Sequence, residues 1–354
     1  MPSRTGAQHL IDALSANGVE RIFGVPGESY LAALDALVDA GIPFIQCRHE
    51  AGAANMAEAH GKLTGRPGIC FVTRGPGATQ AAVGVHTALQ DSTPMILLVG
   101  QVRREDEGRE AFQELDYGQA FAGLAKAAFE IRDPARVPEM MMRAFSLAMN
   151  GRPGPVVVGL PEDMLTEIAD APAAAALPMA RSEVSASTAA EIAQMIDAAD
   201  RPVVMVGGPG WRDEDRTALH AFAEQMNCPV ITSFRVKHLF DNKHSHYGGE
   251  AGIGACPAVV GALREADLIV AIGPRLGEMT TQSYDLFDVP EGVADRLVHI
   301  HPGGEELGRV YRPKLAVTAQ AGPALSSIHA ASRPERAATR SEWVKQCRAA
   351  YDAW

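Results

Sequence analysis

Short apolar runs alternate along the chain with longer stretches in which apolar residues recur every three or four positions. The short runs are typical of buried strands, and the periodic stretches are typical of helices. At the start of the chain this pattern predicts strands over residues 21–25, 42–47, 68–73 and 95–100, and helices over 5–17, 30–39, 50–62 and 79–90. Ser29 is the predicted N-cap of the second helix. The alternation predicts a mainly parallel sheet covered on both faces, which is a doubly wound α/β domain.

The pattern changes after residue 100 and then resumes. Residues 101–116 are charged and irregular, and they precede predicted helices over 120–128 and 137–149 and a strand over 154–159. Residues 169–186 are rich in Ala and Pro without an apolar period, as in a linker. Beyond them we predict helices over 187–198, 216–226 and 257–265, strands over 202–206, 229–232, 268–272 and 297–301, a Gly-rich connection over 248–254, and a last helix over 341–354.

These elements divide the chain into four predicted segments. The first is an α/β domain over residues 1–168, and the second is a linker over 169–186. A second α/β domain with a Rossmann-like order covers residues 187–335, and a helical tail covers 336–354. The length of 354 residues agrees with two domains of about 150 residues each.

Composition narrows the choice of partners. The chain is 47% hydrophobic and 21% charged, as in ordinary globular proteins, and its net charge of -11 argues against nucleic acid as a partner. Residues 1–6 lack the apolar run of a signal peptide, and no apolar run reaches the length of a membrane span. We therefore expect no membrane association and a cytoplasmic location.

Cysteine and histidine spacing gives little sign of a metal site. The five cysteines are scattered and form no C-x-x-C pair, so neither a disulfide framework nor a zinc site is indicated. His238, His244 and His246 cluster in one stretch, where His244 and His246 form an H-x-H pair. A metal site and a solvated loop both fit this pair, and the interleaved Asn, Asp and Lys favour the loop.

Three phrases at the ends of successive predicted strands carry more information. They are Gly24-Val25-Pro26-Gly27, Arg48-His49-Glu50 and Gly75-Pro76-Gly77-Ala78-Thr79. Taken alone, Glu50 is an ordinary first-turn residue that favours a helix N-terminus. In this order, however, the phrases resemble those of the thiamine-diphosphate enzymes of the acetolactate synthase and pyruvate oxidase group. The resemblance implies that the first domain binds the pyrimidine of thiamine diphosphate and that the second is the family's central domain.

The resemblance also implies roles for individual residues. Glu50 matches the family's glutamate, which hydrogen-bonds a pyrimidine nitrogen and so promotes loss of a proton from the thiazolium carbon. The residues implied to border the pyrimidine are Pro26, Gly27, Thr73, Gly75 and Gly77. The residues implied on the substrate side are Glu28, Ser29, His86, Phe112, Gln113 and Lys126. From the residues alone, Phe112 would be a core residue, and Gln113 and Lys126 would be surface residues.

Two departures from the family pattern leave alternatives open. Glu28 and Ser29 stand where typical acetolactate synthases carry Gly and a small residue, so the Glu28 carboxylate would either repel a keto-acid carboxylate or serve as an extra acid or base. His86 is either an acid or base near the site or a buried helix histidine. The Gly207–Gly210 turn suits the pyrophosphate of FAD, but residues 233–237 stand where flavin-binding relatives carry Gly-Lys-Gly. An ordinary turn is the favoured interpretation there.

The family's third domain, which holds Mg²⁺ and the diphosphate through a Gly-Asp-Gly phrase, has no counterpart in this sequence. The resemblance therefore implies a thiamine-diphosphate-dependent carboligase or decarboxylase of small 2-keto acids or aldehydes that is inactive without a missing domain or a separate diphosphate-binding chain. It also implies a homodimer or tetramer formed through the first domain. The alternatives are a non-catalytic or regulatory subunit of the same fold, and an FAD- or nucleotide-binding protein that acts through the second domain.

Overall fold

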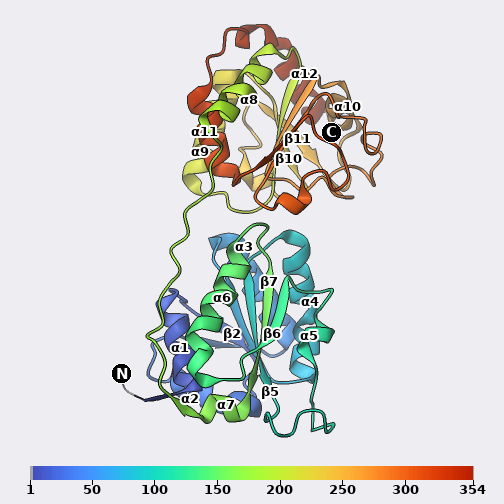
Figure 1. The fold of residues 1–354 in the computed structure, drawn as a ribbon. Coiled ribbons are helices and arrows are strands. Elements are labelled where there is room, and N and C mark those ends of the chain that lie inside the picture. The colour runs from blue at the N-terminus through green and yellow to red at the C-terminus, as the bar shows by residue number, and fades with distance from the viewer. Residues whose placement is uncertain (1–2, 354) are drawn as a thin grey trace. The chain divides into compact units, whose positions relative to one another are not determined.

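The computed structural model describes residues 3–353, which form two compact units divided between residues 179 and 180 (Figure 1). The first unit contains a six-stranded sheet in the order β3-β2-β4-β5-β7-β6, in which all neighbours are parallel. Its strands are β2 (Ile22–Gly24), β3 (Phe44–Gln46), β4 (Gly68–Val72), β5 (Met95–Gln101), β6 (Ala127–Glu130) and β7 (Pro155–Pro161). Two short strands, β1 (Arg4–Thr5) and β8 (Ile168–Ala169), pair separately and antiparallel.

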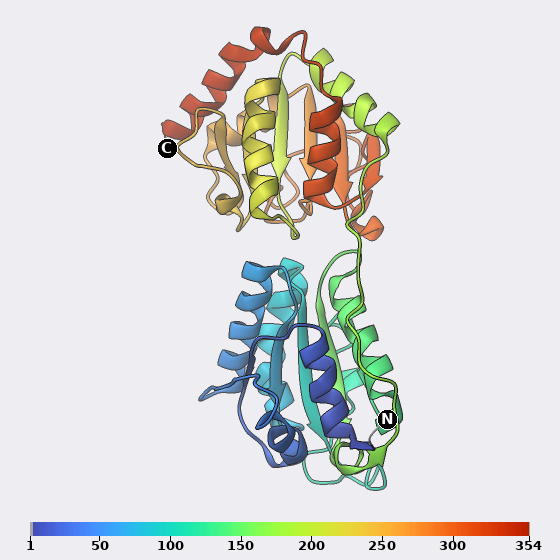
Figure 2. The same cartoon turned by 90° about the vertical axis from the view of Figure 1, so that its left-hand side faces the viewer.

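Helices cover both faces of this sheet (Figures 1 and 2). One face carries α1 (Gly6–Ala16), α2 (Leu31–Leu37), α6 (Val137–Met149) and α7 (Glu162–Thr166). The other face carries α3 (Glu50–Thr64), α4 (Pro76–Asp91) and α5 (Tyr117–Ala120). The small residues of α3 and α4 let their backbones approach closely, because a Cβ added at Gly84 would lie 2.5 Å from the Cβ of Ala54. No helix within residues 3–353 is long and apolar enough to cross a membrane.

Three predictions for the first unit are wrong in detail. The strand predicted over 42–47 is β3, an exposed edge strand rather than a buried one, because it has a single neighbour, β2. The helix predicted over 120–128 is absent, since α5 ends at Ala120 and residues 127–130 form β6. Ser29 caps no helix and lies in the 3-10 turn Glu28–Tyr30, where its Oγ is 2.9 Å from the Oγ1 of Thr73.

The second unit repeats the same design with an all-parallel sheet in the order β11-β10-β9-β12-β13-β14. Its strands are β9 (Pro202–Val206), β10 (Val230–Ser233), β11 (Tyr247–Ala251), β12 (Leu268–Ile272), β13 (Leu297–His301) and β14 (Leu315–Thr318). Helices α8 (Ala186–Ala198), α9 (Asp213–Met226) and α11 (Ala321–Ala331) pack on one face, and α10 (Pro257–Glu265) and α12 (Ser341–Asp352) pack on the other. Both units thus confirm the predicted doubly wound α/β fold.

Two elements of the second unit were not predicted, and one was misassigned. The Gly-rich connection expected over 248–254 is largely β11. This edge strand was not predicted because its glycines are typical of turns rather than of strands. The other edge strand, β14, and the helix α11 that follows it were not predicted. β14 has only four residues, of which alternate ones are exposed, and β11 is rich in Gly although four of its five residues are buried. Neither strand therefore has the long apolar run that marks the central strands.

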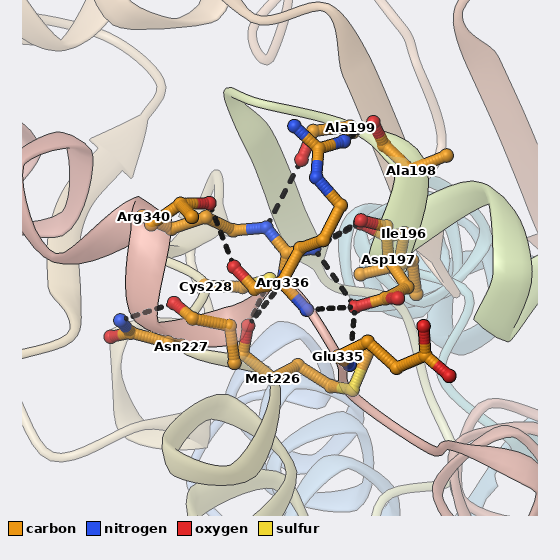
Figure 3. Close-up of polar contacts among 12 residues, drawn as sticks. Ile196, Asp197, Ala198, Ala199, Met226, Asn227, Cys228, Glu335, Arg336 and Arg340 are labelled. Carbon is orange, nitrogen blue, oxygen red and sulfur yellow. Dashed lines mark hydrogen bonds and ion pairs between the residues drawn. The ribbon is translucent and has the colours of Figure 1, made fainter.

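The predicted tail is packed into the second unit, since Trp343, Val344 and Cys347 of α12 are buried; Trp354 lies outside the described residues. Just before α12, the fully buried Arg340 donates hydrogen bonds to four backbone carbonyls (Figure 3). Three belong to the end of α8, Ile196 at 2.8 Å, Asp197 at 2.7 Å and Ala199 at 3.1 Å, and the fourth is Met226 at 2.6 Å in α9. One guanidinium therefore satisfies the last carbonyls of two helices.

We predict that Arg340→Met lowers the free energy of unfolding of the second unit by about 3 kcal/mol, because several buried carbonyls lose their donor. The matched control is Arg336→Met, whose guanidinium contacts Ala198 O and Asp200 at the surface and whose loss should change the value by about 1 kcal/mol or less. Urea titrations followed by tryptophan fluorescence report on this unit alone, because the tryptophans are residues 211, 343 and 354. Equal effects of the two substitutions would contradict the anchoring role.

Candidate functional site

The three phrases found in the sequence lie together where the strands of the first sheet end, at what we call the carboxyl edge. Gly24, the last residue of β2, pairs with Gln46 of β3 on one side and with Phe71 of β4 on the other. The N–H of Cys47 donates to the carbonyl of Gly24 over 2.8 Å, so the chain leaves β3 beside the turn that follows β2. The structure thus brings the turn after β2, the start of α3 and the turn after β4 to one edge.

Glu50 is the first residue of α3 and is half-buried. Its neighbour His49 caps the helix, since Nδ1 accepts a hydrogen bond from the N–H of Ala51 over 3.0 Å. The carboxylate of Glu50 receives no hydrogen bond from any residue within 3–353. Because Glu50 lies at a helix N-terminus, where the dipole favours negative charge, the carboxylate is held at the edge with its acceptor capacity unused.

Tyr30 connects Glu50 to the turn after β2. Its hydroxyl donates to the carbonyl of Val25 over 2.5 Å, and its ring stacks on Phe71 with 3.9 Å between centroids. Burial raises the pKa of the Tyr30 hydroxyl, and the nearby Cys70 and Glu50 raise it further. Tyr30 is therefore a neutral hydrogen-bond donor that holds the turn after β2 through the carbonyl of Val25. It is close enough to Glu50 for that carboxylate to affect its pKa.

The predicted pyrimidine-binding glycines leave no room for side chains. A Cβ on Gly27 would lie 2.5 Å from the Cβ of Thr73, and one on Gly77 would lie 3.0 Å from the Cγ2 of the same residue. Gly75 has a φ of +43°, and a Cβ added to this residue would lie 2.5 Å from the carbonyl oxygen of Gln113. These contacts require glycine and bring bare backbone to the edge beside the exposed Pro26. A flat ring could approach this backbone closely.

Arg74 is the residue of this edge that the sequence analysis missed. Its side chain is only 10% exposed, and it joins segments that are far apart in the sequence. The Nη2 group donates to Glu28 in the turn after β2, and the Nη1 group donates to Glu162 after β7, each over 3.0 Å. The Nε group donates to the carbonyl of Phe112 over 3.1 Å. The signal available in the sequence was an arginine inside a glycine-rich turn between a strand and a helix.

The loop that carries Phe112 and Gln113 is held over the carboxyl edge. The Phe112 side chain is 72% exposed, so it is not a core residue. It lies between two non-glycine residues with left-handed backbones, Glu110 at φ +55° and Gln113 at φ +66°. The Glu114 carboxylate accepts hydrogen bonds from the N–H groups of Gly108 and Ala111, which fixes the loop from within. The strained backbone is thus stabilised by neighbours and presents an aromatic ring outward.

Two of the predicted substrate-side residues lie elsewhere in the first unit. Lys126 precedes β6 and is therefore at the opposite edge of the sheet, where its Nζ donates to the carbonyls of Asn150 and Arg152 over 2.5 and 2.7 Å. His86 is exposed rather than buried and lies about 15 Å along α4 from Pro76. Neither side chain reaches the carboxyl edge within one chain, which corrects the prediction that groups them with Phe112.

The candidate features of the second unit form no comparable site. His244 contacts Glu224 over 3.0 Å and His246 contacts Asn227 over 3.2 Å, and within residues 3–353 no group of three metal-binding side chains occurs. In the Gly207–Gly210 turn after β9, a Cβ on Gly208 would lie 1.9 Å from the carbonyl oxygen of Gly273, so this glycine serves backbone packing. FAD binding at this turn stays a prediction from the sequence.

Comparison with known proteins decides the family. Residues 4–120 match the model of the N-terminal binding domain of thiamine pyrophosphate enzymes, and residues 189–328 match the model of their central domain. The chain belongs to the thiamine pyrophosphate enzyme family. Thiamine pyrophosphate is the same compound as thiamine diphosphate. The first matched region contains Glu50, Arg74, Phe112 and the glycine turns, so the whole carboxyl edge up to residue 120 lies inside the thiamine pyrophosphate enzyme domain.

The family members most relevant here are acetolactate synthases. The chain is 32% identical over 348 residues to the acetolactate synthase large subunit of Corynebacterium glutamicum, covering 96% of this chain and 55% of that protein. It is 33% identical to a probable acetolactate synthase large subunit of Methanocaldococcus jannaschii, covering 96% and 58%. For the acetolactate synthase isozyme 2 large subunit of Escherichia coli the identity is 29%, covering 97% and 61%. The chain thus spans a little over half the length of these relatives.

We predict that Arg74→Met loosens the 102–116 loop while the sheet stays folded. The loop loses a charge-assisted hydrogen bond at Phe112, and such bonds are worth about 1.5–3 kcal/mol, so amide exchange in the loop should speed up by roughly tenfold or more. Hydrogen exchange with mass spectrometry measures this. Arg103→Met is the matched control, since Arg103 is exposed and pairs with nearby Glu105. Unchanged exchange in Arg74→Met would show that other contacts hold the loop.

Proposed function

We propose that this chain forms the pyrimidine-binding and central parts of a thiamine-diphosphate-dependent, acetolactate synthase-like carboligase or decarboxylase of small 2-keto acids or aldehydes. The observation that carries the proposal is the Glu50 carboxylate, which lies at the carboxyl edge beside bare glycine backbone and has no hydrogen-bond donor within residues 3–353. A non-catalytic subunit would have no need for such a carboxylate. The glycine contacts fit the pyrimidine ring, because Gly27 and Gly77 leave only backbone and the Thr73 side chain beside it.

When bound, thiamine diphosphate supplies a thiazolium carbon that becomes nucleophilic after loss of a proton. Glu50 would hold the far pyrimidine nitrogen by sharing a proton with it through a carboxylate oxygen. Gly27, Gly75 and Gly77 let the backbone contact the ring. Glu28 is held by Arg74, so it meets a substrate as part of an ion pair rather than as a free carboxylate. Phe112 gives the substrate an apolar surface.

We assign Mg²⁺ and the diphosphate to a region that the longer relatives carry or to a separate chain, because the family's Gly-Asp-Gly phrase does not occur in this sequence. The contacts left to this chain are a few neutral hydrogen bonds and a small apolar contact. Each such bond is worth about 1 kcal/mol net, which does not offset the several kcal/mol lost when a flexible ligand is immobilised.

We predict that residues 1–354 alone bind thiamine diphosphate no tighter than roughly millimolar and do not turn over pyruvate. Adding a diphosphate-binding domain, in trans or by extension of the chain, should restore both tight thiamine diphosphate binding and pyruvate turnover. In the restored enzyme, Glu50→Gln should lower turnover by roughly 100-fold or more, because the pyrimidine loses the carboxyl that shares its proton. Calorimetry measures binding, and pyruvate consumption measures turnover.

The matched control for Glu50→Gln is Glu342→Gln, since Glu342 lies exposed in the first turn of α12, in the second unit. Its substitution should leave turnover unchanged, and both variants should melt within a few degrees of the parent. Tight, Mg²⁺-dependent binding by residues 1–354 alone would show that the diphosphate site is misplaced. Full turnover by Glu50→Gln would reject the catalytic assignment itself.

We also propose that two copies associate through α3 and α4. Both helices are rich in Ala and Gly and carry exposed apolar side chains, Met56 and Leu63 on α3 and Val83 on α4. Such a surface suits close contact with a second copy related by a two-fold axis.

We therefore expect a dimer in sedimentation experiments at micromolar concentration. Val83→Asp should raise the dissociation constant of the dimer by roughly tenfold or more, because a charge would be buried at the interface. Val38→Asp is the control, since Val38 is 78% exposed at the end of α2 on the other face of the sheet. A parent protein that sediments only as a monomer would reject this interface.

A further inference from the structure

A cavity lies at the edge of the first sheet that is remote from Glu50. Its volume is about 160 Å³, and it is formed where α1 and α3 end and where β2 and β4 begin. Its wall contains the basic side chains of Arg21, His60 and Arg66, the acidic side chain of Glu20, and the apolar side chains of Val19, Pro67 and Phe145. Nothing in the proposed thiamine chemistry uses this cavity.

The basic side of the cavity has unused hydrogen-bond donors. Arg21 forms a surface ion pair with its neighbour Glu20 over 3.5 Å. The guanidinium of Arg66 makes no hydrogen bond or ion pair with any residue within 3–353. Burial lowers the pKa of His60, and Arg21 and Arg66 lower it further against the opposing effect of Glu20. At neutral pH the cavity wall therefore carries two guanidinium groups, the carboxylate of Glu20 and an imidazole that is mostly uncharged.

A purely structural explanation accounts for part of this arrangement. Cations are favourable near helix C-termini, and Arg21 and Arg66 lie beyond the ends of α1 and α3. That effect explains the positive charges, but the planar donor set of the solvent-exposed Arg66 has no protein acceptor within residues 3–353 and lies at a cavity with an apolar part. A guanidinium presents paired N–H groups whose geometry matches a carboxylate.

We propose that this cavity binds a small aliphatic carboxylate. The carboxylate accepts hydrogen bonds from Arg66 and Arg21, and the alkyl group packs against Val19, Pro67 and Phe145. The volume sets the size of the ligand, because a cavity of about 150 Å³ accommodates benzene, which corresponds to about six heavy atoms. A four-carbon monocarboxylate fits this limit. This site is separate from the carboxyl edge and does not depend on the proposed enzymatic function.

Butyrate is the probe, and butyramide, which has the same shape without the charge, is its neutral control. Butyrate should shift the His60 imidazole resonance saturably in a titration of the purified chain at constant ionic strength, with a dissociation constant of roughly 1 mM. Butyramide should produce no saturable shift. The resonance is assigned from its absence in His60→Gln.

Arg66→Gln should weaken butyrate binding by roughly tenfold, since it removes the charge and the paired donors. Arg66→Lys should weaken it less, because the charge remains. The matched control is Arg143→Gln. Arg143 lies on α6, and its exposed guanidinium lies over the ring of Phe129 in β6, so this substitution should leave butyrate binding unchanged. Absence of saturable binding, equal binding of butyramide, or an unchanged dissociation constant in Arg66→Gln would each overturn the proposal.

Discussion

The candidate site depends on one nearly buried guanidinium. Arg74 follows β4, but its three bonds reach the turn after β2, the start of α7 and the loop that carries Phe112. Its partners Glu28 and Glu162 stay 66% and 38% exposed, and ion pairs with solvent-exposed partners contribute little net stability. The network is therefore better understood as a positional constraint than as a source of stability. It links three segments through side-chain bonds, and it holds the loop that carries Phe112 beside the glycine turns.

This constraint also separates the carboxylates of the edge into two kinds. Glu28 and Glu162 share one cation, which leaves the three groups with a net charge of about -1 when all are ionised. Glu50 lies at a helix N-terminus, and its carboxylate has no hydrogen-bond donor within residues 3–353. A ring nitrogen can therefore compete for Glu50 without breaking an existing bond. Glu28 is 66% exposed and one of its oxygens contacts Arg74, so a ligand would meet it as half of an ion pair. Both open interpretations of Glu28 therefore have to include that pair.

The sequence predicted the elements that are determined locally. The fully buried runs at β4, β5 and β7 and the capped start of α3 are specified by adjacent residues, so their positions were correct within a few residues. The failures are β6, read as a helix, and β11, read as a connection, because both are edge strands whose identity depends on a neighbouring strand. Arg74 was missed for a related reason: its partners come from turns that only the strand order brings together. Lys126 was placed on the substrate side by its resemblance to a family lysine, although it precedes β6 and so lies at the edge of the sheet opposite to the one where the strands end.

In a parallel sheet the edge where the strands end and the edge where they begin lie on opposite sides of the domain. Here α3 runs from the first edge, at Glu50, to the second, at the cavity. Glu50 is its first residue, and His60 of the remote cavity lies in its last turns, with the 15-residue helix spanning about 22 Å. A ligand in the cavity is therefore linked to Glu50 through a rigid body rather than through a loop. The close contact of Ala54 with Gly84 means that α3 cannot slide along its axis without moving α4, whose first residues border the glycine turn. Any displacement of α3 must then carry α4 and that turn with it as a concerted shift of two helices, because packed interiors transmit strain instead of absorbing it.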